Sequence, residues 1–155
     1  MKFLLLLCIL LSPTAWADKQ AQRKQLAQRY MGLLLATDYA QLSEYLNDSS
    51  KLIDKTASKT YTGKRSIIEF LRLSTAGIET YRFEQERFFI AKKTAVFIGQ
   101  YHYKGAGDLY GYPNQTIQFS VPAVTVLSVD EKENIITEHR DYFDYENLTP
   151  EVLNQ

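Results

Sequence analysis

The chain has 155 residues, and its 18 Lys and Arg balance its 18 Asp and Glu, so the formal net charge is zero. This length suits one domain around one core, and the near-neutral charge argues against a nucleic-acid partner held by phosphate contacts. One cysteine and two histidines provide no basis for a disulfide framework and argue against a zinc site.

The N-terminus has the pattern of a secretory signal. Lys2 precedes the apolar run Leu4–Leu11, Ser12-Pro13 interrupts the run, and Ala15-Trp16-Ala17 supplies the small residues that a signal peptidase recognises. The apolar run is shorter than the roughly 20 residues needed to span a bilayer, which argues against an uncleaved anchor. We therefore expect a signal peptide over residues 1–17, cleaved after Ala17, and a mature protein that is periplasmic or secreted without a membrane span.

Two helices are expected before residue 47. Four apolar residues within 18–37 recur at the spacing of one helix face: Leu26, Tyr30, Leu33 and Leu34. Asp38 is a typical N-cap residue, and a second, short helix is expected over Tyr39–Leu46. Asn47, Asp48, Ser49 and Ser50 then indicate a turn.

The rest of the chain predicts one more helix and a series of strands. A short strand at 51–55 precedes a helix at Lys64–Ser74. From Tyr81 the apolar period changes to two, which predicts strands at 81–90, 94–103, 116–129 and 135–145. Pro122 indicates a bulge or an edge in the third of these strands. The order predicts an α+β domain over 18–146, with helices packed on one antiparallel sheet, and a loose tail at 147–155.

The segment Ile136–Asp144 resembles a known protein family. Its sequence Ile-Thr-Glu-His-Arg-Asp-Tyr-Phe-Asp is similar to the last strand of SnoaL-like and limonene epoxide hydrolase-like proteins, two branches of the nuclear transport factor 2-like superfamily. Thr62-Gly63-Lys64 is a second match, and the resemblance covers about residues 20–146. It implies a cone-shaped α+β barrel, in which three N-terminal helices pack on a curved antiparallel sheet around an apolar pocket. It also implies a homodimer, since many relatives are dimers.

The last predicted strand carries the first candidate site residues. Thr137, His139, Asp141 and Phe143 share one face of it. In the epoxide hydrolase-like branch, the aspartate that matches Asp141 faces the pocket and takes part in proton transfer. The resemblance thus implies that Asp141 is a general acid or base and that His139 and Phe143 contact the ligand. The alternative is a structural Asp141 that pairs with an arginine or accepts backbone hydrogen bonds.

Gln100 and His102 on the strand at 94–103 are further candidates. The epoxide hydrolase-like branch has an arginine and a second aspartate two residues apart on this strand, and our alignment matches Gln100 and His102 to them. That triad is therefore incomplete here. We expect instead that His102 and Asp141 meet in one pocket and shuttle a proton, with Gln100 contacting the ligand. The alternative for His102 is a hydrogen-bonding role in a polar patch.

Asp54 and a group of tyrosines complete the candidates. In steroid isomerase-like relatives an acidic residue near the end of the first strand acts as the base, and Asp54 occupies that neighbourhood as a candidate ligand contact. The alternative is an exposed Asp54 paired with a lysine. Four tyrosines cluster near the predicted hairpin: Tyr101, Tyr103, Tyr110 and Tyr112. They form an aromatic wall for a flat ligand or a dimer surface, or they are ordinary strand residues.

Two functions stay open at this stage. The first is an exported protein that binds a compact apolar or aromatic molecule and performs cofactor-independent acid–base chemistry of the isomerase or cyclase type. The second is a non-catalytic ligand-binding or dimerisation module of the same fold. No cofactor is expected, because Gly105-Ala106-Gly107 lacks the strand-to-helix context of a phosphate loop. A cavity with Asp141 and a histidine in hydrogen-bond reach would support the first function, and a cone packed shut by aromatic residues would contradict it.

Overall fold

A computed structural model describes residues 13–153 of the chain, with side chains from residue 17 onward. Residues 1–12 of the expected signal peptide lie outside this range. The first helix, α1 (Pro13–Leu35), begins upstream of the expected cleavage site at Ala17. In the described part of the chain, no helix combines the length and apolar character that a membrane crossing requires.

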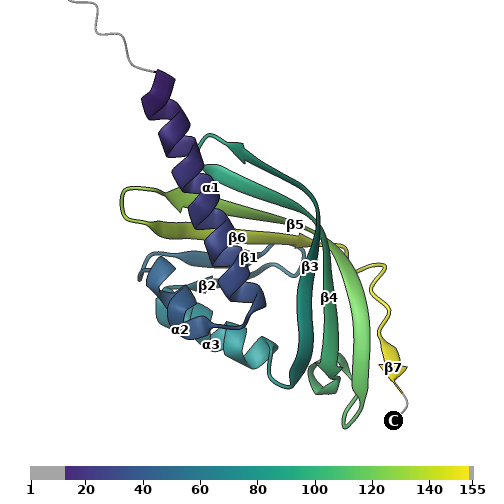
Figure 1. The fold of residues 1–155 in the computed structure, drawn as a ribbon. Helices are drawn as coiled ribbons and strands as arrows, with labels where there is room; N and C mark the ends of the chain where they lie inside the picture. The colour runs from purple at the N-terminus through teal and green to yellow at the C-terminus, as the bar shows by residue number, and fades with distance from the viewer. Residues whose placement is uncertain (1–12, 154–155) are drawn as a thin grey trace, which may run out of the picture.

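Three helices cover one side of a curved sheet, with α1 lying across the strands and α2 and α3 lying beside its lower end (Figure 1). Asp38 caps α2, because its side chain accepts a hydrogen bond from the backbone N–H of Gln41 at 3.1 Å. The expected helix up to Leu46 instead tightens into a 3₁₀ turn after Leu42. The bounds are α2 Tyr39–Leu42, η1 Ser43–Tyr45 and α3 Lys64–Ser74.

Seven strands form one sheet in the order β2-β1-β6-β5-β4-β3, with β7 paired to β5 beside this path. All pairs are antiparallel except β1 and β6, which are parallel, so the sheet is mixed and not purely antiparallel as expected. The chain can pair these two strands in parallel because a helix and three long strands separate them in sequence. The bounds are β1 Lys51–Asp54, β2 Lys59–Thr62, β3 Ile78–Ala91, β4 Thr94–Ala106, β5 Thr116–Asp130, β6 Ile135–Phe143 and β7 Glu151–Leu153, with a 3₁₀ turn η2 at Asp108–Tyr110.

Three local features of the sheet differ from expectation or refine it. The strand β2 was not predicted, because it is short, polar and largely exposed. The expected loose tail is wrong for Glu151–Leu153, which pairs with Thr116–Gln118 as β7. Pro122 causes no bulge, since its register with Gln100 on β4 is continuous. Pro122 lies between the part of β5 that pairs with β7 and the part that pairs with β6. No strand pairs with it on that side, so its missing N–H removes no hydrogen bond from the sheet.

A bulge in β3 bends the sheet around the helices. The register between β3 and β4 shifts between Gln85 and Arg87. Opposite the bulge the two backbones approach so closely that a Cβ on Gly99 would lie 2.1 Å from the Glu84 carbonyl oxygen. Only glycine fits there without displacing β3, and the bend that results wraps the long strands toward α1.

The core lies between α1 and the concave face of the sheet. The four apolar residues of the predicted stripe on α1 are all buried, and they pack against buried residues of the central strands. At its N-terminal half, α1 is tied to two turns of the sheet by Arg23, which donates to the Glu131 carboxylate at 2.6 Å and to the Lys92 carbonyl at 2.8 Å. The helix is therefore fixed both by apolar burial and by one ion pair.

Removing the carboxylate of Glu131 should destabilise the fold in a pH-dependent way. The hydrogen bond from Arg23 lowers the pKa of Glu131 to about 2, below the value of about 4.3 expected in the unfolded chain. The stabilisation is therefore complete above about pH 4.3 and is lost as the pH falls toward 2. For Glu131→Gln we expect a free energy of unfolding lower by no more than about 1 kcal/mol at pH 7, and a difference from wild type that shrinks toward pH 2.

Thermal unfolding followed by circular dichroism between pH 2 and 7 checks this expectation. Glu133→Gln is the matched control, since Glu133 is exposed on the same turn and pairs with no cation within residues 13–153. A Glu131→Gln deficit of constant size across the pH range would contradict the account.

Candidate functional site

The last long strand, β6, places His139 and Asp141 at the base of an internal cavity. Alternate residues of β6 face the helices, so His139 and Asp141 are 1% and 8% exposed while Tyr142 is 43% exposed on the other face. The cavity has a volume of about 210 Å³ and is lined by α1, β1, α3, β3, β6 and the hairpin after β4. The predicted alternation on this strand therefore positions both residues as expected.

Five side chains form a continuous series of polar contacts beneath the cavity. The Tyr30 hydroxyl lies 3.2 Å from His139 Nδ1, and His139 Nε2 lies 2.9 Å from Asp141 Oδ2. Thr125 donates to Asp141 Oδ1 at 2.5 Å. Because its only hydrogen is used there, Tyr101 must donate to Thr125 across their 2.9 Å contact. The series runs from α1 across β6 and β5 to β4 and is buried throughout.

The contacts of His139 determine which of its ring nitrogens carries the proton. Burial raises the pKa of Tyr30, and the nearby Asp141 charge raises it further, so Tyr30 stays a neutral donor. Because Nε2 lies 2.9 Å from the Asp141 carboxylate, the proton of a neutral imidazole is favoured on Nε2, and Nδ1 then accepts the hydrogen bond that the Tyr30 hydroxyl donates. Asp141 has no arginine partner among the described residues, so the expected structural pairing with an arginine is wrong.

Asp54 lines the same cavity because β1 pairs in parallel with β6. The register places Asp54 directly beside Asp141. The Tyr145 hydroxyl donates to Asp54 Oδ2 at 2.6 Å, and the Ala57 N–H donates to Oδ1 at 2.8 Å. Burial and the hydrogen bond to Asp54 raise the pKa of Tyr145. Asp54 forms no ion pair with a lysine in the described chain, which excludes the alternative expected from the sequence.

The structure does not bring His102 or Gln100 to the cavity. Tyr101 and Tyr103 are the residues of β4 that face inward, so the residues between and beside them face outward. His102 Nδ1 lies 2.6 Å from the Ser120 hydroxyl, and Nε2 lies 3.2 Å from the Glu84 carboxylate, on the outer face. The expected pair of His102 and Asp141 is wrong, because successive residues of a strand face opposite sides of the sheet and Tyr101 and Tyr103 take the inner side.

Two tyrosines supply hydrogen-bond donors that the sequence analysis did not assign to this site. Tyr81 and Tyr110 line the cavity, and the hydroxyl of neither has a hydrogen-bond partner within residues 13–153. Burial raises the pKa of Tyr110 to about 12 and that of Tyr81 well above its usual value, so both remain neutral donors. Tyr81 and Phe83 lie on the same inward face of β3. The alternation of aromatic and charged residues in this segment was the sequence signal that could have identified Tyr81 as a cavity residue.

Aromatic rings separate the cavity from a smaller one. The second hollow has a volume of about 120 Å³ and is also lined by Phe119 and Val121 of β5 and by Leu148. Five aromatic residues line both spaces: Tyr81, Tyr103, Tyr110, Phe143 and Tyr145. Phe143 therefore contacts the cavity as expected. The cone is narrowed by these rings and not packed shut, and His139 remains in reach of Asp141.

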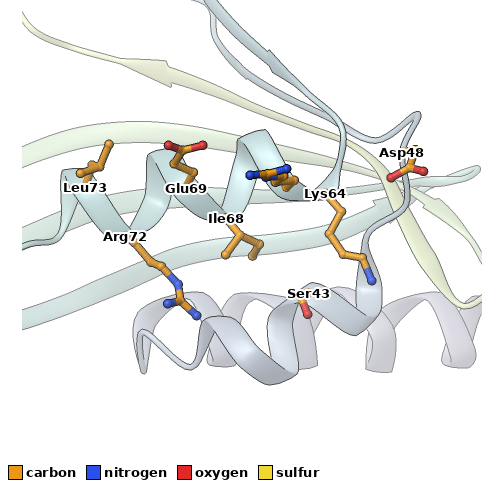
Figure 2. A pocket seen from close by; sticks show the side chains of 8 residues that line it. Ser43, Asp48, Lys64, Ile68, Glu69, Arg72 and Leu73 are labelled. Atoms are coloured by element: carbon orange, nitrogen blue, oxygen red, sulfur yellow. The ribbon is translucent and has the colours of Figure 1, made fainter.

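A larger hollow of the described chain lies elsewhere and lacks comparable chemistry. It has a volume of about 640 Å³ and lies on the surface between α3 and the segment that carries Ser43. Lys64, Ile68 and Arg72 point toward that segment, as Figure 2 shows. Arg65, Glu69 and Leu73 are exposed at the same place. Long solvated side chains of both signs line this open groove, so its size does not indicate a reaction site.

Solved structures identify the family of the chain. A candidate SnoaL-like polyketide cyclase from Shewanella putrefaciens is 42% identical, with a TM-score of 0.79 over 81% of this chain and 91% of that one. The chain belongs to the SnoaL-like family. A second candidate SnoaL-like polyketide cyclase, from Shewanella denitrificans, is 40% identical, with a TM-score of 0.78 over 80% of this chain and 91% of that one.

More distant structures show that this SnoaL-like chain has the nuclear transport factor 2-like fold, as the resemblance of β6 implied. An LEH-like epoxide hydrolase from M. tuberculosis has a TM-score of 0.65 and 17% identity, over 83% of this chain and 87% of that one. At that identity the likeness concerns the fold alone. The sequence matches no family model and no curated protein.

Replacing Tyr30 by phenylalanine should release the tautomer of His139. Without the phenol, Nδ1 loses its donor, so we expect a mixture of the two neutral tautomers and a loss of about 1–3 kcal/mol in the free energy of unfolding. Long-range ¹H–¹⁵N NMR of the imidazole rings at pH 8.5 measures the tautomer directly. Tyr39→Phe is the matched control, because Tyr39 contacts Thr75 and not a histidine. An unchanged Nε2–H form in Tyr30→Phe would show that Tyr30 does not set the tautomer.

Proposed function

We propose that this SnoaL-like protein binds a compact small molecule above Asp141 and transfers a proton on it without a cofactor, as isomerases and cyclases do. The contact between His139 and Asp141 at the base of the 210 Å³ cavity carries this proposal. A buried carboxylate that faces a cavity and lies beside a histidine is a typical arrangement for a general acid or base. Family membership alone would establish the fold and not the reaction.

The dimensions and walls of the cavity limit the substrate. A volume of about 210 Å³ is below the roughly 300–1,000 Å³ of sites for drug-sized ligands, so the substrate is small. Tyrosine and phenylalanine rings line much of the wall and favour flat or compact apolar groups. The expected apolar or aromatic ligand is thus retained in the proposal.

Each cavity group has a defined part in the proposed step. Asp141 accepts a proton from a carbon next to a carbonyl group, and negative charge develops on the carbonyl oxygen. The free hydroxyl of Tyr81 or Tyr110 donates a hydrogen bond to that oxygen and stabilises the charge. Asp141 then returns the proton to the same or another carbon. Thr125 holds the carboxylate in one orientation during both transfers through its hydrogen bond to Oδ1.

Proton transfer of this kind can be detected without knowing the natural substrate. A panel of compact cyclic ketones is incubated with the protein in D₂O, and NMR measures deuterium incorporation next to the carbonyl. We expect acceleration by the wild type for at least one member. We expect a loss of 10²-fold or more in Asp141→Asn, because the variant lacks the base.

Asp144→Asn is the matched control for Asp141→Asn. Asp144 lies three residues further along, accepts a hydrogen bond from Asn147 and does not line the cavity. Its exchange rate should equal that of the wild type. Equal rates in wild type and Asp141→Asn, with the same ketone bound to both, would leave a non-catalytic binding module as the function.

We also propose that the protein is exported, on the basis of the pattern in residues 1–17. N-terminal sequencing of the protein from the envelope or the medium of its host should begin at Asp18. Ala17→Leu is expected to slow processing, because a large residue replaces the small one at the cleavage site, whereas Asp18→Asn should be processed normally. Protein that stays with the cytosolic fraction and begins at Met1 would contradict export.

A further inference from the structure

We infer that the ligand of this cavity is a compact organic cation, an ammonium compound that also carries an oxygen acceptor. The inference rests on the proposed function in one respect, that the cavity binds a small molecule. Two carboxylates, a set of aromatic rings and a buried donor without an aligned acceptor converge on the same space. Each of these three features sets a different chemical requirement for the ligand, and together the requirements describe one class of compound.

The two carboxylates lack a lysine or arginine partner within residues 13–153. Asp54 and Asp141 are direct neighbours on parallel strands, so their side chains share one face of the sheet. Within the described residues neither forms an ion pair with Lys or Arg, and no Lys or Arg lines the cavity. Like charges directly opposite each other in a sheet repel, and Asp141 is a buried group of the kind that is normally paired when charged. A positive ligand between them would supply the missing charge.

The walls of the cavity suit an organic cation better than a hydrated metal ion. Tyr81, Tyr110, Tyr145 and Phe143 present aromatic rings to the space. The negative face of such rings attracts ammonium groups, and the attraction grows when both partners are removed from water. No group of three or more metal-ligating side chains occurs in the described part of the chain. The phenols remain neutral, since burial raises the pKa of Tyr81 and Tyr145.

His139 adds the requirement for an acceptor. His139 is one of the residues that line the cavity, and its Nε2 is buried. Although Nε2 lies 2.9 Å from Asp141 Oδ2, its N–H is not aligned with any acceptor of the described chain. Buried donors of this kind are normally satisfied. An oxygen on the ligand would accept a hydrogen bond from the Nε2–H of His139, while the ammonium group of the ligand lies toward Asp54 and the aromatic rings. Compact amino alcohols and amino ketones have both groups.

A pair of isosteric probes tests the charge alone. Choline and 3,3-dimethylbutan-1-ol have the same shape and hydroxyl group, and only choline carries a positive charge. Calorimetric or NMR titration of the full chain should give a dissociation constant at least ten-fold lower for choline. Asp54→Asn should raise the constant for choline ten-fold or more and change that for the neutral alcohol less than two-fold. Tyr110→Leu should weaken choline about three-fold, while Tyr110→Phe keeps the ring and the affinity.

The outcomes separate this inference from the proposed function. If the neutral alcohol binds as tightly as choline, or if Asp54→Asn leaves choline binding unchanged, the ligand is not a cation, although the cavity still takes small molecules. If neither probe binds when its concentration is raised into the millimolar range, 20-fold above that of the protein, the cavity does not accept compact molecules. Both proposals then fail. Circular dichroism of each variant verifies that it is folded, and Tyr110→Leu provides the test if Asp54→Asn is not.

Discussion

The contact between the Tyr30 hydroxyl and His139 Nδ1 is the interaction on which the site depends. Both side chains are almost fully buried, and removing one partner of a buried polar pair costs about 1–3 kcal/mol. The contact therefore fixes three things at once: the position of α1 on the sheet, the orientation of the imidazole, and the nitrogen that faces Asp141. The helix that forms the core is thus also the element that sets the chemistry of the cavity.

The parallel pairing of β1 with β6 is the second determinant of the site, because it places Asp54 beside Asp141. The two carboxylates receive hydrogen bonds only from neutral groups of the described chain, apart from the contact with His139. This leaves a negative space surrounded by aromatic rings. Such a space is unfavourable for an empty core, which is the physical reason for proposing a ligand of opposite charge.

The sequence allowed the elements and the strand that carries the site to be predicted, because those depend on local periodicity. The bounds of α3 agree with expectation at both ends, and the alternation of His139 and Asp141 on β6 is as predicted. The position of His102 was predicted wrongly, since the face on which it lies depends on where β4 begins its alternation, and Tyr101 and Tyr103 take the inner face. The parallel pairing that recruits Asp54, and the phenols of Tyr30 and Tyr81, depend on contacts between distant segments, which no local pattern encodes.

The central claim is that ligands enter the small cavity above Asp141 and not the larger groove beside α3. A ¹⁵N-resolved NMR screen with compact cyclic ketones and amines tests this claim most directly, because it locates binding without requiring turnover. The account predicts amide shifts that cluster on Asp54, the end of β6 and the hairpin at Tyr110, with α3 changed only near Leu71. Shifts confined to Lys64, Ile68 and Arg72 would place the binding site in the surface groove of Figure 2 and contradict the account.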